Sequence, residues 1–200
     1  MHWTNQVSLL LLILFSGLFL WKLIVLRQKA KINAYAFTQG NKPRKLKRVE
    51  LQVKLAAFLW MMVWIGEVFF KQFLDSYICC LMPNSYMKIY GLIGIFIGIT
   101  LFAAAMYWMK DSWRVGIDKQ TATRLVTDGI YQFSRNPAFL GCYVMTFGLV
   151  IIYQDLPTLM TMVAVIYTFH QLVLAEEKHL EAAFGSEYEE YREKTHRYFW

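Results

Sequence analysis

An arginine and an asparagine stand directly before a long apolar run in the segment 129–141. Arg135 and Asn136 precede Pro137, and the chain is then almost entirely apolar as far as residue 152. Asn136 suits the N-cap of a helix and Pro137 suits its first position. The donors of Arg135 and the unpaired N–H groups of that helix's first turn would face one place, which favours an anionic or zwitterionic ligand. A capped helix with an interfacial arginine is the simpler alternative.

Two further polar clusters lie near the end of the sequence. Glu176 and Glu177 follow another apolar run, and a later basic cluster consists of Lys194, His196 and Arg197. Paired carboxylates can hold hydroxyls or an amine, whereas Arg135 and Arg197 can hold a carboxylate. An exposed network of ion pairs would account for the same charges, although such networks contribute little stability. We interpret the acids and arginines as the frame of a binding pocket.

The composition predicts that these polar segments belong to an integral membrane protein. Of the 200 residues, 57% are hydrophobic and only 18% are charged, and the apolar residues occur in runs long enough to cross a bilayer. The expected fold is all-α, a polytopic membrane protein with about five transmembrane helices, a C-terminal helical hairpin and amphipathic tail helices. The expected spans are Trp3–Leu26, Leu51–Phe70, Ile89–Met109, Pro137–Ile152 and Leu156–Leu174.

The placement of positive charge predicts the topology. The net charge is +7, and basic residues cluster in the segment 27–48, after the first span. The positive-inside rule makes this loop cytoplasmic and puts the N-terminus outside. Five spans then place the basic loop, the Arg135 segment and the Glu176–Glu177 pair on the cytoplasmic side. No basic helix or aromatic RNA-binding motif accompanies the charge, so we expect membrane lipids rather than nucleic acid as partners.

The connection between the last two apolar runs is short enough to make them an antiparallel hairpin. Only Tyr153, Gln154 and Asp155 separate the runs, so the start of one helix lies beside the end of the other. Arg135 and Glu177 should therefore meet. Gly185 is expected to end the last long helix.

Local patterns predict several contacts outside the pocket. Ser186 and Glu189 have the spacing of a capping box, and Gly94 and Gly98 have the spacing that lets membrane helices approach closely. Glu67 is an intramembrane carboxylate and thus a functional candidate, but Lys71 follows four residues later and can pair with it. Cys79, Cys80 and Cys142 form neither a disulfide framework nor a zinc motif, and no metal site is expected.

The chain divides into residues 1–110, which hold the first three spans and the basic loop, and residues 111–200, which hold the polar clusters. The second part resembles the isoprenylcysteine carboxyl methyltransferases and their bacterial relatives, with a looser similarity to the phospholipid methyltransferases. The similarity runs from Trp113 to the end of the sequence. Its residues are Trp113–Ile117, Leu125–Tyr131, Ser134–Pro137, Phe139 and Gly141, followed by Glu176, Glu177, Leu180, Phe184, Gly185, Glu187, Tyr188, Tyr191 and Arg197.

This resemblance implies an S-adenosylmethionine-dependent methyltransferase with a lipophilic acceptor, in a bacterial inner membrane. The implied catalytic residues are Arg135, Glu177 and Arg197, with Lys194 as an alternative to Arg197 at the acceptor. Implied residues at the adenosine end are Leu125, Val126, Gly129 and Tyr131. Asn136 and Pro137 would join Arg135 at the methionine moiety, and Glu176 and Glu177 would bind cofactor polar groups or help to hold the substrate. The implied cofactor-binding set also includes Phe139, Gly141 and Tyr188.

Three positions depart from the family's usual residues. Asn136 stands where histidine is common, and asparagine cannot shuttle a proton near neutral pH. Phe139 stands where tyrosine is common, and Thr195–His196 replaces a frequent Val-Pro pair. These departures leave the acceptor open, and the sequence does not indicate an oligomeric state.

Two other functions fit the same features. An NADPH-dependent membrane reductase of the sterol type would need additional basic residues for the 2′-phosphate, and Lys119 and Arg124 are candidates. A membrane scaffold that kept this fold but lost activity would accommodate Asn136 in place of histidine.

Overall fold

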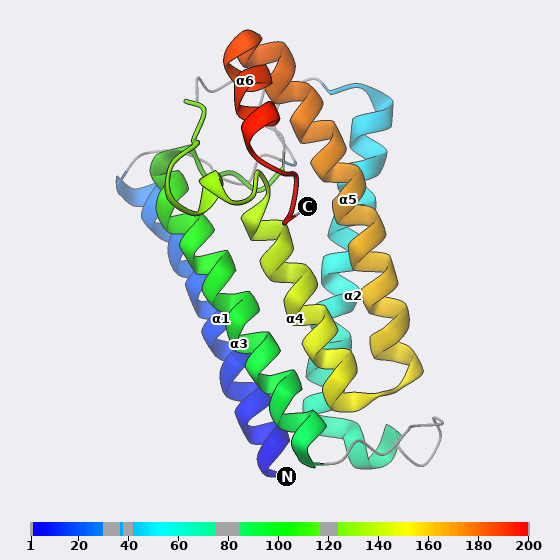
Figure 1. The fold of residues 1–200 in the computed structure, drawn as a ribbon. Coiled ribbons are helices and arrows are strands. Elements are labelled where there is room, and N and C mark those ends of the chain that lie inside the picture. The colour runs from blue at the N-terminus through cyan, green and yellow to red at the C-terminus, as the bar shows by residue number, and fades with distance from the viewer. Residues whose placement is uncertain (1, 30–36, 38–41, 75–84, 117–123, 200) are drawn as a thin grey trace.

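The computed structural model describes residues 2–29, 37, 42–74, 85–116 and 124–199. The regular elements in these ranges are all helical, so the predicted all-α class is confirmed (Figure 1). The helices are α1 (Trp3–Lys29), α2 (Arg44–Leu74), α3 (Ser85–Met109), α4 (Pro137–Tyr153), α5 (Leu156–Phe184) and α6 (Ser186–Lys194). Two single turns of 3₁₀-helix, η2 (Lys110–Ser112) and η3 (Gly129–Gln132), lie between α3 and α4.

Four of the described helices are long and apolar enough to cross a membrane. The candidate spans are Trp3–Gln28, Arg44–Lys71, Ser85–Ser112 and Leu156–Phe184, whereas the apolar helix α4 is shorter, at 17 residues. Large apolar side chains such as Leu10, Phe58 and Phe96 point outward from the bundle. Such a surface is stable in lipid, where exposed apolar side chains carry no penalty. The protein is therefore an integral membrane protein with an apolar five-helix bundle.

Helices α3 and α4 run antiparallel and approach closely through glycines on both sides. An added Cβ at Gly98 would lie 2.6 Å from the carbonyl oxygen of Gly141, and one at Gly91 would lie 2.7 Å from that of Gly148. The two contacts are seven residues apart on each helix, so they repeat on one face after two turns. The predicted packing role of Gly98 is confirmed, while Gly94 makes a looser contact, 3.7 Å from the Cα of Gly148.

The predicted hairpin joins α4 to α5. Gln154 takes a left-handed conformation (φ 50°), and the Asp155 carboxylate then accepts a hydrogen bond from the Thr158 amide at 3.0 Å, which caps α5. Helix α5 continues without a break through Glu176 and Glu177 and ends at Phe184. Gly185 follows with φ 53°, as expected for the residue that ends a helix.

The predicted capping box at the start of α6 is wrong. Gly185 occupies the N-cap of this helix, Ser186 is already its first residue, and no side chain caps it. Gly185, with its positive φ, is both the residue that ends α5 and the N-cap of α6. Ser186 is therefore one position too late to cap.

A buried ion-pair cluster ties α2 to the hairpin at the end of the bundle that contains the N-terminus. Lys71 Nζ lies 3.3 Å from Glu67 and 2.8 Å from Asp155, and both carboxylates are almost fully buried. The predicted pairing of Glu67 with Lys71 is confirmed. The partner that the sequence did not indicate is Asp155, because its approach to Lys71 requires the hairpin to pack against α2.

The polar clusters of the sequence all lie at the opposite end of the bundle. Figure 1 shows the start of α2, the end of α3, the start of α4 and helix α6 gathered there, far from the N-terminus. The final residues then run back from α6 and lie beside the start of α4 (Figure 1). This end of the molecule therefore holds the candidate site.

The close approach of α3 and α4 predicts the effect of a single methyl group. Gly141→Ala should destabilise the protein by about 1–3 kcal/mol, because the added methyl meets backbone atoms that cannot move aside without separating the helices. Gly66→Ala in α2 is the matched control, since an added Cβ there meets nothing within 4 Å. Thermal unfolding in detergent should show a lower midpoint for Gly141→Ala alone. Equal midpoints for the two variants would contradict this packing.

Candidate functional site

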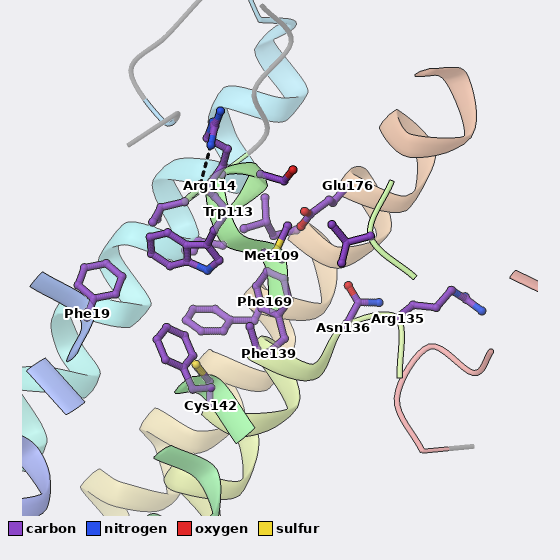
Figure 2. A pocket seen from close by; sticks show the side chains of 18 of the residues that line it. Phe19, Met109, Trp113, Arg114, Arg135, Asn136, Phe139, Cys142, Phe169 and Glu176 are labelled. Atoms are coloured by element: carbon purple, nitrogen blue, oxygen red, sulfur yellow. Dashed lines mark hydrogen bonds between the residues drawn. The ribbon is translucent and has the colours of Figure 1, made fainter. Parts of the chain in front are cut away.

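A cavity of about 570 Å³ opens between the clustered helix ends and extends into the bundle. Its polar end is formed by the Arg135–Asn136 segment, α5 and α6, and its apolar arm by the inner faces of α1 to α5. Figure 2 shows Phe19, Trp113, Met109, Phe139 and Phe169 gathered around this arm, with Glu176 and Asn136 at its edge. The cavity thus joins a polar compartment to an apolar one inside the membrane-spanning part.

The carboxylate of Glu177 is the centre of the polar end. Its Oε1 accepts hydrogen bonds from Arg135 Nε and Nη2 at 3.3 and 3.1 Å and from Asn136 Nδ2 at 3.0 Å. Its Oε2 accepts from Arg197 Nε and Nη2 at 3.0 and 2.9 Å. These bonds raise the pKa of the Arg197 guanidinium, so it remains charged. Both carboxylate oxygens are therefore engaged by donors from two other segments.

Arg135 also holds the C-terminal tail through backbone atoms. Its Nη1 donates to the carbonyl of Thr195 at 2.5 Å, and its amide donates to the carbonyl of His196 at 2.9 Å. The Tyr191 hydroxyl adds a hydrogen bond of 2.7 Å to the carbonyl of Tyr131. In Figure 2 the Arg135 side chain points away from the aromatic arm. Its donors therefore fasten the tail.

Asn136 occupies the N-cap of α4 as predicted, but its side chain does not cap the helix. Its Nδ2 donates to Glu177 at 3.0 Å and to the carbonyl of Arg197 at 3.3 Å, and its own amide donates to Ser134 Oγ at 3.2 Å. The side chain thus turns from its own helix toward α5 and the tail.

The last described residues are inserted between α4 and α5. The Tyr198 hydroxyl lies 2.9 Å from His170 Nδ1 and 3.3 Å from the Tyr143 hydroxyl. The Tyr198 and Tyr143 rings also meet edge to face, with centroids 5.5 Å apart. The tail is therefore held at both Arg197 and Tyr198.

Two polar groups face the cavity without a hydrogen-bond partner of good geometry among the described residues. The Tyr188 hydroxyl is buried and unpaired, and the Glu176 carboxylate points into the cavity (Figure 2). Burial, with Glu177 nearby, raises the pKa of Tyr188 to about 12, and burial, with Glu176 nearby, raises that of Tyr131 well above its usual value. Both phenols are therefore neutral. An unpaired buried hydroxyl is costly, so a ligand that bonds it is favoured.

Apart from Phe139, the apolar arm was not recognisable from the sequence. Phe139 and Phe169 meet edge to face with centroids 5.8 Å apart, and Cys142, which also lines the cavity, lies below them in the view of Figure 2. The remaining wall of the arm includes residues of α1 and α2. These residues carry no motif, and the sequence predicted only that they belong to membrane spans. They include Phe15, Phe19, Leu20, Ala57, Trp60 and Met61. Only helix packing shows that these positions face inward.

Most of the expected site residues line the cavity. They are Leu125, Val126, Tyr131, Arg135, Asn136, Phe139, Glu176, Glu177 and Tyr188.

Four expected site residues are not among those that line the cavity. Gly141 packs on α3, and Gly129, with φ 63°, packs on the Trp108 ring, where neither position has room for a side chain. Pro137 is buried in the first turn of α4. Arg197 binds Glu177 from the tail. Lys119, Cys79 and Cys80 lie outside the described residues.

Removing the charge of Glu177 should loosen the tail. Glu177→Gln leaves Arg135 and Arg197 without their shared anion, at an expected cost on the order of 2–3 kcal/mol, because hydrogen bonds to a charged group are lost. Trypsin should then cleave after Lys194 faster than in the parent protein. Glu181→Gln is the control, because its pair with Arg192 is exposed at 42% and 45% and such pairs contribute little. Equal cleavage rates for the two variants would contradict this role.

Comparison with known proteins places the chain in a family. A family model described as phospholipid methyltransferase matches residues 86–187. The chain is 34% identical over 72 residues to a protein-S-isoprenylcysteine O-methyltransferase of Schizosaccharomyces pombe, which covers 36% of this chain and 30% of that protein. It is 27% identical over 114 residues to a probable protein-S-isoprenylcysteine O-methyltransferase of Oryza sativa subsp. indica, over 56% and 60% of the two chains.

The chain therefore spans less than two thirds of the length of these curated relatives. The matched range contains the Arg135–Asn136 segment, the α4–α5 hairpin and both glutamates. The expected relationship is confirmed: the chain belongs to the phospholipid methyltransferase family and is related to the isoprenylcysteine O-methyltransferases.

Proposed function

We propose that this protein is an S-adenosylmethionine-dependent methyltransferase that methylates a lipophilic acceptor, such as an isoprenylcysteine-type carboxylate. The observation that carries this proposal is the continuous cavity, which joins the Glu176–Tyr188 polar end to an aromatic arm inside the bundle. The methyl donor is polar, whereas the chain of an amphiphilic acceptor is apolar, so the two ligands match the two parts of the cavity. One cavity with these two parts can bring both into contact and exclude water.

The polar end fits S-adenosylmethionine by the chemistry of its side chains. Glu176 can accept hydrogen bonds from ribose hydroxyls or an amino group, and the unpaired Tyr188 hydroxyl can donate one. Leu125, Val126 and Tyr131 supply an apolar wall for an adenine ring. When bound, the cofactor supplies a methyl group on a sulfonium, which is already activated for transfer.

An acceptor carboxylate needs no general base in this reaction. Attack of its oxygen on the methyl carbon forms a C–O bond, and the C–S bond breaks with its electron pair retained on sulfur. The products are a methyl ester and S-adenosylhomocysteine, and no proton is released. Asn136 in place of histidine is compatible with this chemistry because no proton has to be shuttled.

Glu177 is better suited to organising the site than to accepting a proton. Arg135, Asn136 and Arg197 donate to both of its oxygens, and two neighbouring cations stabilise its charged form. We propose that Arg135 and Arg197 position Glu177 and close the tail over the polar end. Phe139, whose ring faces Phe169 in the arm, would contact the acceptor chain.

Binding measurements in detergent test the cofactor assignment. S-adenosylhomocysteine and S-adenosylmethionine should raise the thermal midpoint, whereas NADPH should not. Glu176→Gln should weaken S-adenosylhomocysteine binding about tenfold, or about 1.4 kcal/mol, because a carboxylate hydrogen bond is stronger than an amide one. Glu181→Gln on the exposed surface serves as the control.

Mass spectrometry should then detect the methyl ester of N-acetyl-S-farnesyl-L-cysteine. Stabilisation by NADPH alone would favour a reductase, and binding of neither nucleotide would favour a scaffold. Either result would overturn the proposal.

We also propose that the site faces the cytoplasm of a bacterial cell, with residues 1–110 supplying part of the arm and residues 111–200 the rest of the arm and the cofactor end. The support is the basic residues at the end of α1 and the start of α2, which lie at the same end as the cavity (Figure 1). In a bacterial host, green fluorescent protein fused after Trp200 should fluoresce, and alkaline phosphatase at the same point should be inactive. The reverse pattern would show that the site faces outward.

A further inference from the structure

The apolar arm of the cavity ends at one level of α1 and α2. Going away from the polar end, the residues that line it continue as far as Phe15 on α1 and Met61 on α2. Among the described residues, the next turn of each helix does not line the cavity, although Leu11 and Trp64 there are both buried. The arm is therefore closed on this side of the bundle.

The other two walls of the arm stop in the same way. The last lining residues are Cys142 on α4 and Phe169 on α5, and Figure 2 shows Cys142 across the aromatic arm from Glu176. One turn further along, Met145 and Val165 are fully buried and do not belong to the described residues that line the cavity. A packed layer from four helices thus lies beyond the end of the arm.

Three aromatic rings close this end of the arm. The Phe15 ring meets the Phe102 ring edge to face, with centroids 5.2 Å apart, and lies 5.6 Å from the Trp60 ring. We call Phe15, Trp60 and Phe102 the aromatic floor. On the far side of this floor, the Trp64 ring stacks on Phe15 at 6.4 Å, and its Nε1 donates to Ser8 Oγ at 2.9 Å. Because protein interiors are close-packed, a ligand chain can pass the floor only by displacing these rings.

The length of the cavity can be compared with the length of an isoprenoid chain. On the unbroken helix α5, the cavity is lined from Leu180 to Phe169, which is about 16 Å at about 1.5 Å per residue. An extended chain covers at most about 3.6 Å in three bonds, so three isoprene units of four bonds each span about 14 Å and four units about 19 Å. A chain of three units is therefore shorter than the cavity, and a chain of four units is longer.

We propose that the aromatic floor limits the acceptor chain to about three isoprene units, so that farnesyl-type acceptors bind more tightly than geranylgeranyl-type ones. This inference deepens the proposed function and rests on it for the isoprenoid nature of the acceptor. Phe15 and Trp60 lie outside residues 86–187, which carry the family match. The N-terminal helices would thus determine which chain length the site accepts.

Competition binding in lipid nanodiscs tests this length limit without turnover. N-acetyl-S-farnesyl-L-cysteine and N-acetyl-S-geranylgeranyl-L-cysteine each compete with the radiolabelled farnesyl compound, and concentrations are expressed per lipid because both compounds reside in the membrane. The parent protein should bind the farnesyl compound about tenfold more tightly, since the fourth unit meets packed rings. Equal affinities would show that the longer chain leaves the arm, for example past Leu20, which lines the cavity and is 55% exposed. That result would overturn the proposal.

Removing the central ring of the floor should relax the limit. Phe15→Ala should reduce the preference for the farnesyl compound at least about threefold, because the space left by the ring can take a further isoprene unit. Phe15→Leu, which keeps more of the packing, should shift the preference in the same direction by a smaller factor. Phe58→Ala is the control, because this ring is 65% exposed on the outer face of α2. An unchanged preference in both Phe15 variants would overturn the role of the floor.

Adding bulk at the end of the arm should have the opposite effect. Cys142→Met should weaken binding of the farnesyl compound about threefold or more and leave that of N-acetyl-S-geranyl-L-cysteine within about twofold, because only the longer chain reaches this level. Equal losses for the two chains would contradict a length limit, as would failure of the parent protein to bind the farnesyl compound. Since binding alone is measured, absence of methyl transfer would contradict only the proposed function.

Discussion

The polar end of this protein depends on one carboxylate shared by three side chains from two other segments. Glu177 comes from α5, Arg135 and Asn136 from the start of α4, and Arg197 from the tail. Two guanidinium groups at such short range would repel one another without an anion between them. The carboxylate itself is largely buried and would be costly without partners. The cluster is thus stable only as a whole, and it determines where the tail lies.

Glycine packing in the bundle makes that cluster possible. The contacts of Gly98 with Gly141 and of Gly91 with Gly148 hold α3 against α4 along their lengths. Because lipid does not drive helices together, close backbone approach has to supply the packing energy. The position of α4 then follows, and with it the position of Arg135 and Asn136, the two residues directly before the helix. At the other end, Lys71 joins α2 to the hairpin through Glu67 and Asp155, so both ends of the hairpin are anchored by buried charge.

The cavity combines surfaces that no single segment of the sequence contains. Its acidic and phenolic groups come from α5 and α6, its aromatic arm from all of the long helices, and its basic rim from α2 and the segments on either side of residues 117–123. Each surface has a chemical counterpart in an amphiphilic acceptor and a zwitterionic cofactor. The functional proposals rest on this division of the cavity.

The sequence by itself determined the helical class, the hairpin, the ending of α5 at Gly185 and the meeting of Arg135 with Glu177. These features are local or follow from a three-residue connection, and helical periodicity and turn chemistry act over that range. The tertiary structure decided the rest. It placed Gly141 against the backbone of α3 and Gly129 against the Trp108 ring. It directed the Asn136 side chain to Glu177 instead of to its own helix. It also brought Phe19, Trp60 and Lys54 into the cavity. Apolar residues occupy most positions of α1 and α2 on all sides of each helix, so only packing against distant helices determines which of them face inward.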